Sequence, residues 1–163
     1  MVWGFELKRD FTIRNSVQSD EGRLREIIGL SFPRFFRFFA SRSLYSEGTV
    51  LVSEASKMVV GFAKLIEFRV GGGTFGCVLW LAVHPDFRRQ NVAAKMVEEG
   101  TNYLLSHHAG AVFASTQRRN SGSMATFRKA GYRRMGFWVC GEFSVGGFSA
   151  FTGGFGLHLE KSC

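Results

Sequence analysis

The sequence predicts a single α/β domain, over residues 1–163, in which helices cover both faces of a mixed β-sheet. The chain has 163 residues, 45% of them hydrophobic, which is enough for one core and too few for two domains of ordinary size. Apolar runs with strand character alternate along the chain with segments of helical periodicity. Glycine and proline stand between many of these segments, where turns are expected.

The first half of the chain contributes two helices and four strands. Leu24, Ile27 and Ile28 are spaced three and four apart, as in a helix with one buried face. Pro33 stands at a position that helices tolerate at their start. The expected elements are a strand at 11–14, a helix capped by Ser19 or Asp20, a helix at 34–44, antiparallel strands at 49–55 and 58–70 joined by a turn at 56–57, and, after the Gly71–Gly73 turn, a strand at 75–83.

Strand-like and helical segments also alternate in the second half of the chain. The sequence shows no internal repeat. Val92, Met96, Tyr103 and Leu104 recur with helical spacing between residues 91 and 107. The remaining expected elements are a buried-type strand at 111–116, a helix from 120 to 131, and strands at 137–143 and 155–159 that flank a Gly/Phe/Ser loop at 146–154.

The charge balance favours anionic partners. There are 21 Lys+Arg against 13 Asp+Glu, a formal net charge of +8, which suits nucleic acid, membrane surfaces or phosphorylated cofactors. Cys77, Cys140 and Cys163 have neither the spacing of a metal site nor the even count of a disulfide framework, so no metal is expected. No apolar stretch reaches the ~18–20 residues that cross a bilayer, and the N-terminus is a poor signal peptide. We therefore expect a cytoplasmic protein without membrane association.

The most informative segment runs from Val83 to Ala94. An apolar run stops at Pro85, the pair Arg88-Arg89 follows, and a helical pattern begins near Asn91. A strand that leads through a basic turn into a helix brings free backbone N–H groups and the positive end of the helix to one point. This pattern predicts an anion site suited to a diphosphate.

This segment resembles the acyl-CoA-binding signature of the GCN5-related N-acetyltransferases (GNAT), Gln/Arg-x-x-Gly-x-Gly/Ala, with Arg88, Asn91 and Ala93 at the defined positions. A second element, Asn120-x-x-Ser123-Met-Ala-Thr-Phe127-Arg-Lys129-Ala-Gly131-Tyr132, resembles the family's Asn-x-x-Ala-x-x-Leu-Tyr-x-Lys-x-Gly-Phe helix. The resemblance covers residues 11–160. It implies the GNAT fold, a mostly antiparallel mixed sheet of about seven strands.

The resemblance also implies acetyl-CoA as cosubstrate. The backbone of Leu81, Ala82 and Val83 would pair with the pantetheine arm, and Arg88 and Arg89 would supply charge. Asn91 departs from the usual glycine, but asparagine enters the left-handed conformation at tolerable cost. The pyrophosphate would lie on the N–H groups of Gln90, Asn91, Val92, Ala93 and Ala94, and the cofactor would also meet Asn120 and Phe127.

Proton transfer is harder to assign. By resemblance, the N–H of Val83 stabilises the developing oxyanion. Phe127 stands where the family has a tyrosine that acts as the general acid. Ser123 or Tyr132 would take over that role, directly or through water. Cys77 and Ser115 stand at the two positions where relatives have the glutamate that acts as the general base.

Glu67 is therefore the first candidate for the base and His84 the second. Glu67 is otherwise a solvated strand residue that pairs with Arg69 or Lys64, and His84 a turn residue. Transfer without dedicated groups is a third alternative, with a bound water relaying the proton and positioning supplying much of the catalysis.

The acceptor side is aromatic. Phe32, Phe35, Phe36 and Phe39 follow helical spacing, with Arg34, Arg37 and Arg42 around them, and form either a core face or a wall of the acceptor pocket. The phenylalanines of loop 146–154 suggest an apolar acceptor. The expected function is acetyl transfer to a primary amine of a small molecule, an amino acid or a peptide N-terminus.

Two other functions stay open. One is a non-catalytic acyl-CoA-binding or sensor domain, which Phe127, Cys77 and Ser115 favour. The other is a basic nucleic-acid-binding module, which the net charge favours but the missing basic–aromatic strand pattern does not. The partners expected are therefore acetyl-CoA and an amine, with no nucleic acid. The resemblance is also compatible with a homodimer.

Overall fold

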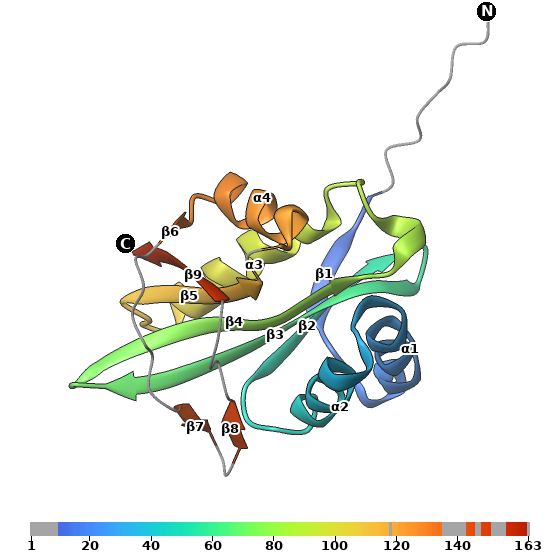
Figure 1. Ribbon diagram of the computed structural model, residues 1–163. Helices are drawn as coiled ribbons and strands as arrows, with labels where there is room; N and C mark the ends of the chain where they lie inside the picture. The colour runs from blue at the N-terminus through green and yellow to red at the C-terminus, as the bar shows by residue number, and fades with distance from the viewer. Residues whose placement is uncertain (1–9, 118, 135–142, 146–147, 151–155, 163) are drawn as a thin grey trace, which may run out of the picture.

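The computed structural model describes residues 10–117, 119–134, 143–145, 148–150 and 156–162 (Figure 1). Its helices are α1 (Glu21–Ser31), α2 (Arg34–Ser43), α3 (Val92–Ser106) and α4 (Ser121–Lys129), with 3-10 turns at Gln18–Asp20 and Pro85–Phe87. Its strands are β1 (Thr12–Asn15), β2 (Thr49–Ala55), β3 (Met58–Val70), β4 (Gly73–Val83), β5 (Ala111–Gln117), β6 (Arg133–Arg134), β7 (Phe143–Val145), β8 (Phe148–Ala150) and β9 (Gly156–Ser162).

Seven of the strands form one sheet in the order β1-β2-β3-β4-β5-β9-β6. Every neighbouring pair is antiparallel except β4 and β5, which are parallel. The predicted mixed, mostly antiparallel sheet is therefore confirmed.

The C-terminal segment differs from the sequence prediction. β6, a pair of exposed arginines at the sheet edge, is the strand that follows α4 in the sheet. Most of the strand predicted at 137–143 lies outside the described residues, and Phe143 begins β7. β8 falls within the segment predicted as a loop and pairs with β7 as a separate two-stranded sheet. The glycines around Phe148–Ala150 masked this strand, because glycine density is typical of loops.

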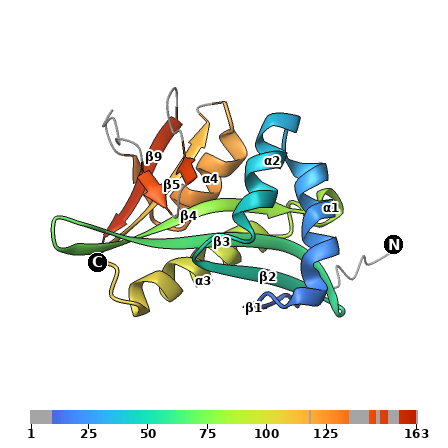
Figure 2. The same cartoon turned by 90° about the horizontal axis from the view of Figure 1, so that it is seen from below.

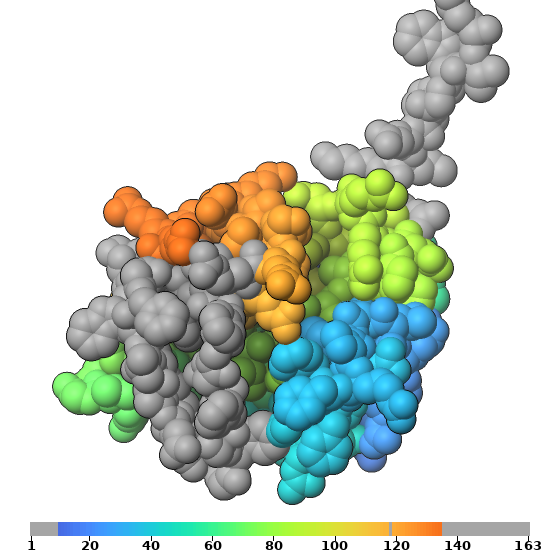
Figure 3. All heavy atoms as spheres, viewed as in Figure 1, coloured from blue at the N-terminus to red at the C-terminus, as the bar shows by residue number. Residues whose placement is uncertain are grey.

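Helices cover both faces of the sheet, as predicted. Helices α1 and α2 lie on one face and α3 on the other (Figures 1 and 2), and Phe127 of α4 packs in the core under α3. In the space-filling view of Figure 3, the lime segment between β4 and α3 lies beside α4 (orange) and above α1 and α2 (blue to cyan). No helix in the described part of the chain is both long enough and apolar enough to span a membrane.

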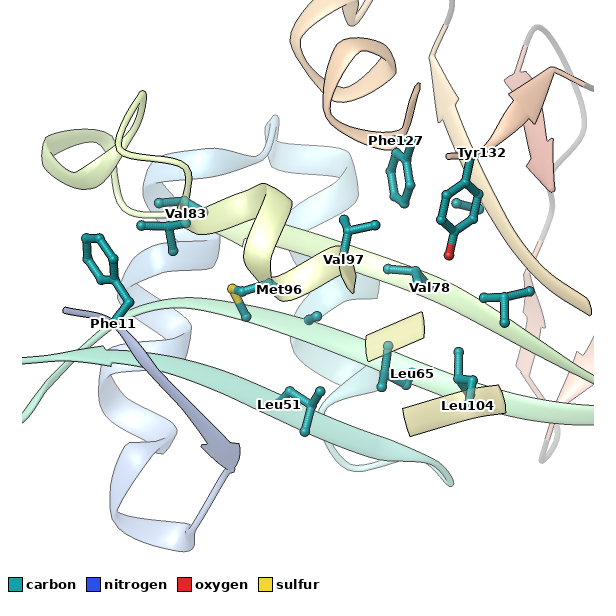
Figure 4. Packing of buried hydrophobic residues seen from close by; sticks show 14 of the residues in the cluster. Phe11, Leu51, Leu65, Val78, Val83, Met96, Val97, Leu104, Phe127 and Tyr132 are labelled. Atoms are coloured by element: carbon teal, nitrogen blue, oxygen red, sulfur yellow. The ribbon is translucent and has the colours of Figure 1, made fainter. Parts of the chain in front are cut away.

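Each face has its own apolar core. Under α3 and α4 the core includes Leu51, Leu65, Val78, Met96, Val97, Leu104, Phe127 and Tyr132 (Figure 4). Under α1 and α2 it includes Leu24, Ile27, Ile28, Ala40, Val52 and Phe62. Gly76 on β4 is required by the packing of α3, because a Cβ there would stand 2.9 Å from the Cβ of Leu104.

Local chemistry explains where the elements begin and end. Ser56 and Lys57 both have positive φ, as a two-residue hairpin turn between β2 and β3 requires. The carboxylate of Asp20 accepts from the N–H of Val17 at 2.9 Å and from Arg14, so Asp20 does not cap α1 with its side chain. Pro33 directly precedes α2, as predicted.

The end of α4 is a Schellman motif. Gly131 has φ 87°, its N–H donates to the carbonyl of Arg128 at 3.0 Å, and the N–H of Tyr132 donates to the carbonyl of Phe127 at 3.0 Å. The rings of Phe127 and Tyr132 complete the motif edge to face, with centroids 5.1 Å apart. The helix stop predicted at Gly131 is therefore confirmed.

Candidate functional site

The sheet opens between β4 and β5. These strands pair only through Gly76–Val78 and Val112–Ala114, whereas β4 continues to Val83 along β3. A register shift leaves Leu79 without a partner on β3 where the two strands part. Within the described residues, one edge of β4 from 79 to 83 is thus left without a strand neighbour. At 3.3 Å per residue this open edge is roughly 17 Å long.

Val83 directs its backbone groups toward the open edge. The N–H of His84 donates to the carbonyl of Val60 at 2.8 Å, which makes this pair a hydrogen-bonded one. Because hydrogen-bonded and non-bonded pairs alternate along antiparallel strands, Val83 and Leu81 turn their N–H and C=O groups away from β3. The Val83 carbonyl accepts there from Nε of Arg88 at 3.1 Å. Its N–H faces the same edge.

The start of α3 presents free donors. The first helical bond runs from the N–H of Lys95 to the carbonyl of Asn91 at 3.1 Å, so the N–H groups of Val92, Ala93 and Ala94 have no acceptor within the helix. Asn91 does not cap them, and the first turn has no acidic residue. Asn91 has φ 65°, which confirms the left-handed conformation predicted for this glycine position. Free N–H groups at the positive end of a helix are the arrangement that suits an anion.

The basic residues at this point have different roles. Arg88 donates to Val83 and, at 3.3 Å, to the Ser31 hydroxyl, so it fixes the end of β4 to the end of α1. Arg89 is exposed and has φ 60°. Lys129 of α4 donates to Oδ1 of Asn91 at 3.0 Å and brings a cation to the start of α3. Lys129 stands in the second motif.

Gln90 and Asn120 stabilise the two loops of the site. Gln90 donates through Nε2 to the carbonyl of Asp86 at 3.2 Å. Asn120 accepts from the N–H of Ser123 at 3.0 Å and thereby caps α4. Ser123 is half-buried in the first turn of that helix.

Tyr132 and Phe127 are core residues. Figure 4 shows their rings side by side above the sheet, and Tyr132 is only 3% exposed. The Tyr132 hydroxyl is hydrogen-bonded to Thr101 at 2.7 Å. Burial raises the pKa of Tyr132 to about 12. The hydroxyl is therefore engaged inside the core and holds its proton strongly.

Glu67 is not brought to the open edge. It lies opposite Gly76, which is seven residues before Val83 on β4, or roughly 23 Å along the strand. Opposite residues share a face of the sheet, and Gly76 faces Leu104 of α3. The exposed Glu67 therefore lies on the α3 face, and within the described residues it forms no ion pair with Arg69 or Lys64.

The other candidates for the base have distinct positions. His84 accepts through Nδ1 from the N–H of Asp86 at 3.3 Å, and its Nε2 stands 3.9 Å from Glu26 of α1. Cys77 is half-buried within the closed part of the β4–β5 pair. Ser115 is exposed on β5, one residue beyond the last pair, where the strands part.

The structure adds one unexpected polar residue, Lys64 on β3. It is fully buried, and its ammonium donates to the Ser46 carbonyl at 2.9 Å. Burial lowers the pKa of Lys64. Its Cα lies opposite Trp80 at the register shift of β4. The signal in the sequence was a lysine within an otherwise apolar strand, Val59–Ile66.

Helix α2 is a core helix on one side only. Its inner side is core, because Phe32, just before the helix, and Phe36 contact Trp80 of β4 edge to face, with centroids 5.3 and 6.3 Å apart. Its outer side is not, because Phe35 and Phe38 are 69% and 64% exposed.

Comparisons with known proteins agree with this geometry. The sequence profile of the Acetyltransferase (GNAT) family matches residues 16–132. A search of the curated proteins finds no match. Among solved structures, a GNAT-family protein from Desulfovibrio desulfuricans has 12% identity and a TM-score of 0.74, with 94% of this chain and 99% of the other covered.

Two further structures share the fold. The PaiA N-acetyltransferase of Thermoplasma acidophilum, in complex with coenzyme A, has 15% identity and a TM-score of 0.70, with 94% of this chain and 99% of the other covered. The ribosomal-protein-alanine N-acetyltransferase of Brucella melitensis has 18% identity and a TM-score of 0.63, with 93% and 99% covered. With its open β4 edge, its uncapped α3 and a family match over most of its length, this chain belongs to the GNAT acetyltransferase family.

Proposed function

We propose that the protein is an acetyl-CoA-dependent N-acetyltransferase that moves an acetyl group to a primary amine within a ternary complex. The observation that carries this proposal is the continuity of two features. An open strand edge at residues 79–83 leads directly to a helix start with three free N–H groups. Such an arrangement suits an elongated cosubstrate with a diphosphate at one end.

The cosubstrate would lie along this path. Its diphosphate would accept from the N–H groups of residues 90–94, with Arg89 and Lys129 adding charge. Its pantetheine arm would follow Leu81, Ala82 and Val83 along the open edge. Arg88 would act indirectly, by holding the end of β4 through the Val83 carbonyl.

The reaction would be direct attack. The amine nitrogen forms a bond to the thioester carbonyl carbon, the C–S bond breaks, and the electron pair leaves with the thiolate. The N–H of Val83 would stabilise the oxyanion, since it faces the open edge. The amine proton would pass to water, and the thiolate would be protonated by Ser123 or by water. Tyr132 is not proposed as the acid, because its hydroxyl is engaged with Thr101.

The acceptor would approach from the face of the sheet covered by α1 and α2, where β4 and β5 part. Trp80 and the aromatic residues of α2 border this side. A peptide N-terminus is the acceptor class that we favour. The Brucella protein in the comparison is named as an enzyme acting on an alanine of a ribosomal protein.

The proposal is tested by placing a carboxylate at the start of α3. Ala93→Asp at the second helical position should weaken coenzyme A binding at least tenfold in calorimetry, because it repels the diphosphate. Ala93 is partly buried against the core, so Tm is measured alongside binding to separate a folding defect from loss of the anion site. Gly22→Asp is the matched control, at the second position of α1 with open space around it.

Two outcomes would contradict the proposal. Absence of heat on titrating coenzyme A into the folded wild-type protein at low ionic strength would remove the cosubstrate site. Tight binding with no thiol released from acetyl-CoA, across a panel of peptides and small amines, would instead support a non-catalytic acyl-CoA sensor. Release of thiol with any amine in the panel supports the enzyme.

A further inference from the structure

The outer side of α2 is a continuous ridge of arginine and phenylalanine. Arg34, Phe38 and Arg42 are spaced four residues apart, so they lie in a row along the helix. All three are exposed, and the exposed Phe35 stands beside them. At 1.5 Å per residue the row is about 12 Å long. Figure 3 shows α2 (cyan) at the surface, on the same face as the lime segment that leads into α3.

The ridge is uniformly basic. Residues 27–46 contain no Asp or Glu, whereas Arg34, Arg37 and Arg42 all lie within them. Arg37 is anchored, because its Nε donates to the Phe32 carbonyl at 2.6 Å. Within the described residues, Arg34 and Arg42 form no ion pair. An acidic partner would complement the charge of this surface.

The ridge lies close to the open edge of β4. Phe36 of α2 packs on Trp80, and Trp80 directly precedes Leu81. A helix is about 10–12 Å thick, so the outer side of α2 is about one helix diameter from the strand. Three or four extended residues cover that distance.

We propose that the outer side of α2 docks an acidic peptide segment whose own N-terminus is the acceptor amine. This inference rests on the proposed function. The first three or so residues of the peptide reach the open edge of β4, and its residues from about the fourth to the eighth lie along the ridge. Carboxylates there pair with Arg34 and Arg42, and an apolar side chain packs on Phe35 or Phe38.

The composition of the ridge favours a polypeptide. Arginine and large aromatic residues are the types enriched at protein interfaces. A membrane-surface helix would separate its phenylalanines from its arginines onto two sides. Here Phe38 stands between Arg34 and Arg42 on one side. The surface is also too extended for a small amine to fill.

A docking surface away from the reacting atoms acts mainly through binding. Contacts that are equal in the ground and transition states change KM and leave kcat unchanged. Exposed charge pairs are also screened by salt. We therefore expect KM for acidic peptides to rise with ionic strength, and KM for neutral peptides to stay constant.

The test uses three ten-residue peptides with identical first three residues and Glu, Gln or Lys at positions four, six and eight. With acetyl-CoA and the wild-type protein, the Glu peptide should have a KM at least tenfold below that of the Lys peptide. Arg34→Glu with Arg42→Glu should reverse this order at unchanged kcat. Arg133→Glu with Arg134→Glu, the same charge change on the edge strand β6, should preserve it. Phe35→Ser with Phe38→Ser should raise KM for all three peptides.

Other results would overturn the inference. Equal KM values for the three peptides in the wild-type protein, or an unchanged order after the charge reversal, would remove the docking surface and leave the acetyltransferase intact. Fluorescence anisotropy with labelled peptides gives the same comparison without turnover. The wild-type protein is also tested for co-sedimentation with phosphatidylserine vesicles and for a gel shift of single-stranded RNA. If either is lost in the Phe35/Phe38 variant while the peptide KM is unaffected, the ridge binds that partner instead.

Discussion

Replacing Tyr132 with phenylalanine separates a packing role from a catalytic one. The Thr101 hydroxyl donates to the Val97 carbonyl at 2.6 Å, which uses its only hydrogen. Tyr132 must therefore donate to Thr101 across their 2.7 Å contact. Phenylalanine keeps the ring packing against Phe127 and leaves only a threonine lone pair without a partner. The expected loss is about 1 kcal/mol, near the low end for a buried hydrogen bond.

Thermal and denaturant unfolding measure this loss. For a domain of this size 1 kcal/mol corresponds to a fall of about 2–4 °C in Tm. The partner change Thr101→Val should destabilise by more, about 1–3 kcal/mol, because it leaves the Tyr132 hydroxyl as a buried donor without an acceptor. The double variant should lose less than the sum of the two changes, since both act on one hydrogen bond.

The pH dependence has a defined sign. Burial raises the folded-state pKa of Tyr132 to about 12, above the ordinary value of 10.0. The stability tied to its proton is then fully present below pH 10 and is lost as the pH rises toward 12. The stability advantage of the wild-type protein over Tyr132→Phe should shrink over this window and then reverse, because two pKa units correspond to about 2.7 kcal/mol, more than the hydrogen bond contributes.

Catalysis gives the decisive comparison. With packing intact, kcat of Tyr132→Phe should stay within about twofold of wild type. A general acid typically contributes 10²–10⁴-fold. A fall of kcat by about 100-fold or more, with Tm unchanged, would refute a purely structural role for Tyr132. It would instead identify Tyr132 as the general acid that protonates the leaving thiolate.

Further predictions concern the two faces of the sheet. Lys64→Met should raise the free energy of unfolding at pH 7 by about 1–3 kcal/mol in urea titrations, because methionine keeps the volume without burying a charge. Burial lowers the pKa of Lys64, so wild-type stability should rise as the pH increases from the folded-state pKa toward 10.5, the ordinary lysine value. This rise should be absent from Lys64→Met. A loss of stability on substitution would contradict the prediction. Gly76→Ala should destabilise by about 1–3 kcal/mol, because its Cβ would meet Leu104 at 2.9 Å, whereas Gly29→Ala, in open space within α1, should stabilise by about 0.5–1 kcal/mol; equal Tm values would disprove the packing argument.

The sequence predicted the backbone of the site well because its signals are local. A proline after an apolar run ends β4, and the left-handed Asn91 precedes α3, as the motif implied. Both bounds of the strands predicted at 49–55 and 58–70 also match, since alternation and the two-residue turn fix them together. The helix stop at Gly131 depends only on neighbouring residues.

The side-chain contacts were less predictable because they depend on register and on neighbours distant in sequence. Glu67 was placed near the acceptor by its position late in β3, but its pairing with Gly76 puts it far from Val83. Arg88 was expected at the phosphates, yet it reaches Ser31, 57 residues away. Burial of Lys64 beneath Ser46 is also a contact that no local pattern reveals.

The short junction between β4 and β5 has a mechanical consequence. Within the described residues, three residue pairs join the β1–β4 part of the sheet to the part formed by β5, β9 and β6, so the strand ladder is weakest at this seam. The core under α3 spans the seam, with Val78 on one side and Val112 on the other, so side-chain packing contributes much of what joins the two parts. A molecule wedged into the seam would couple the two parts and slow amide hydrogen exchange on both.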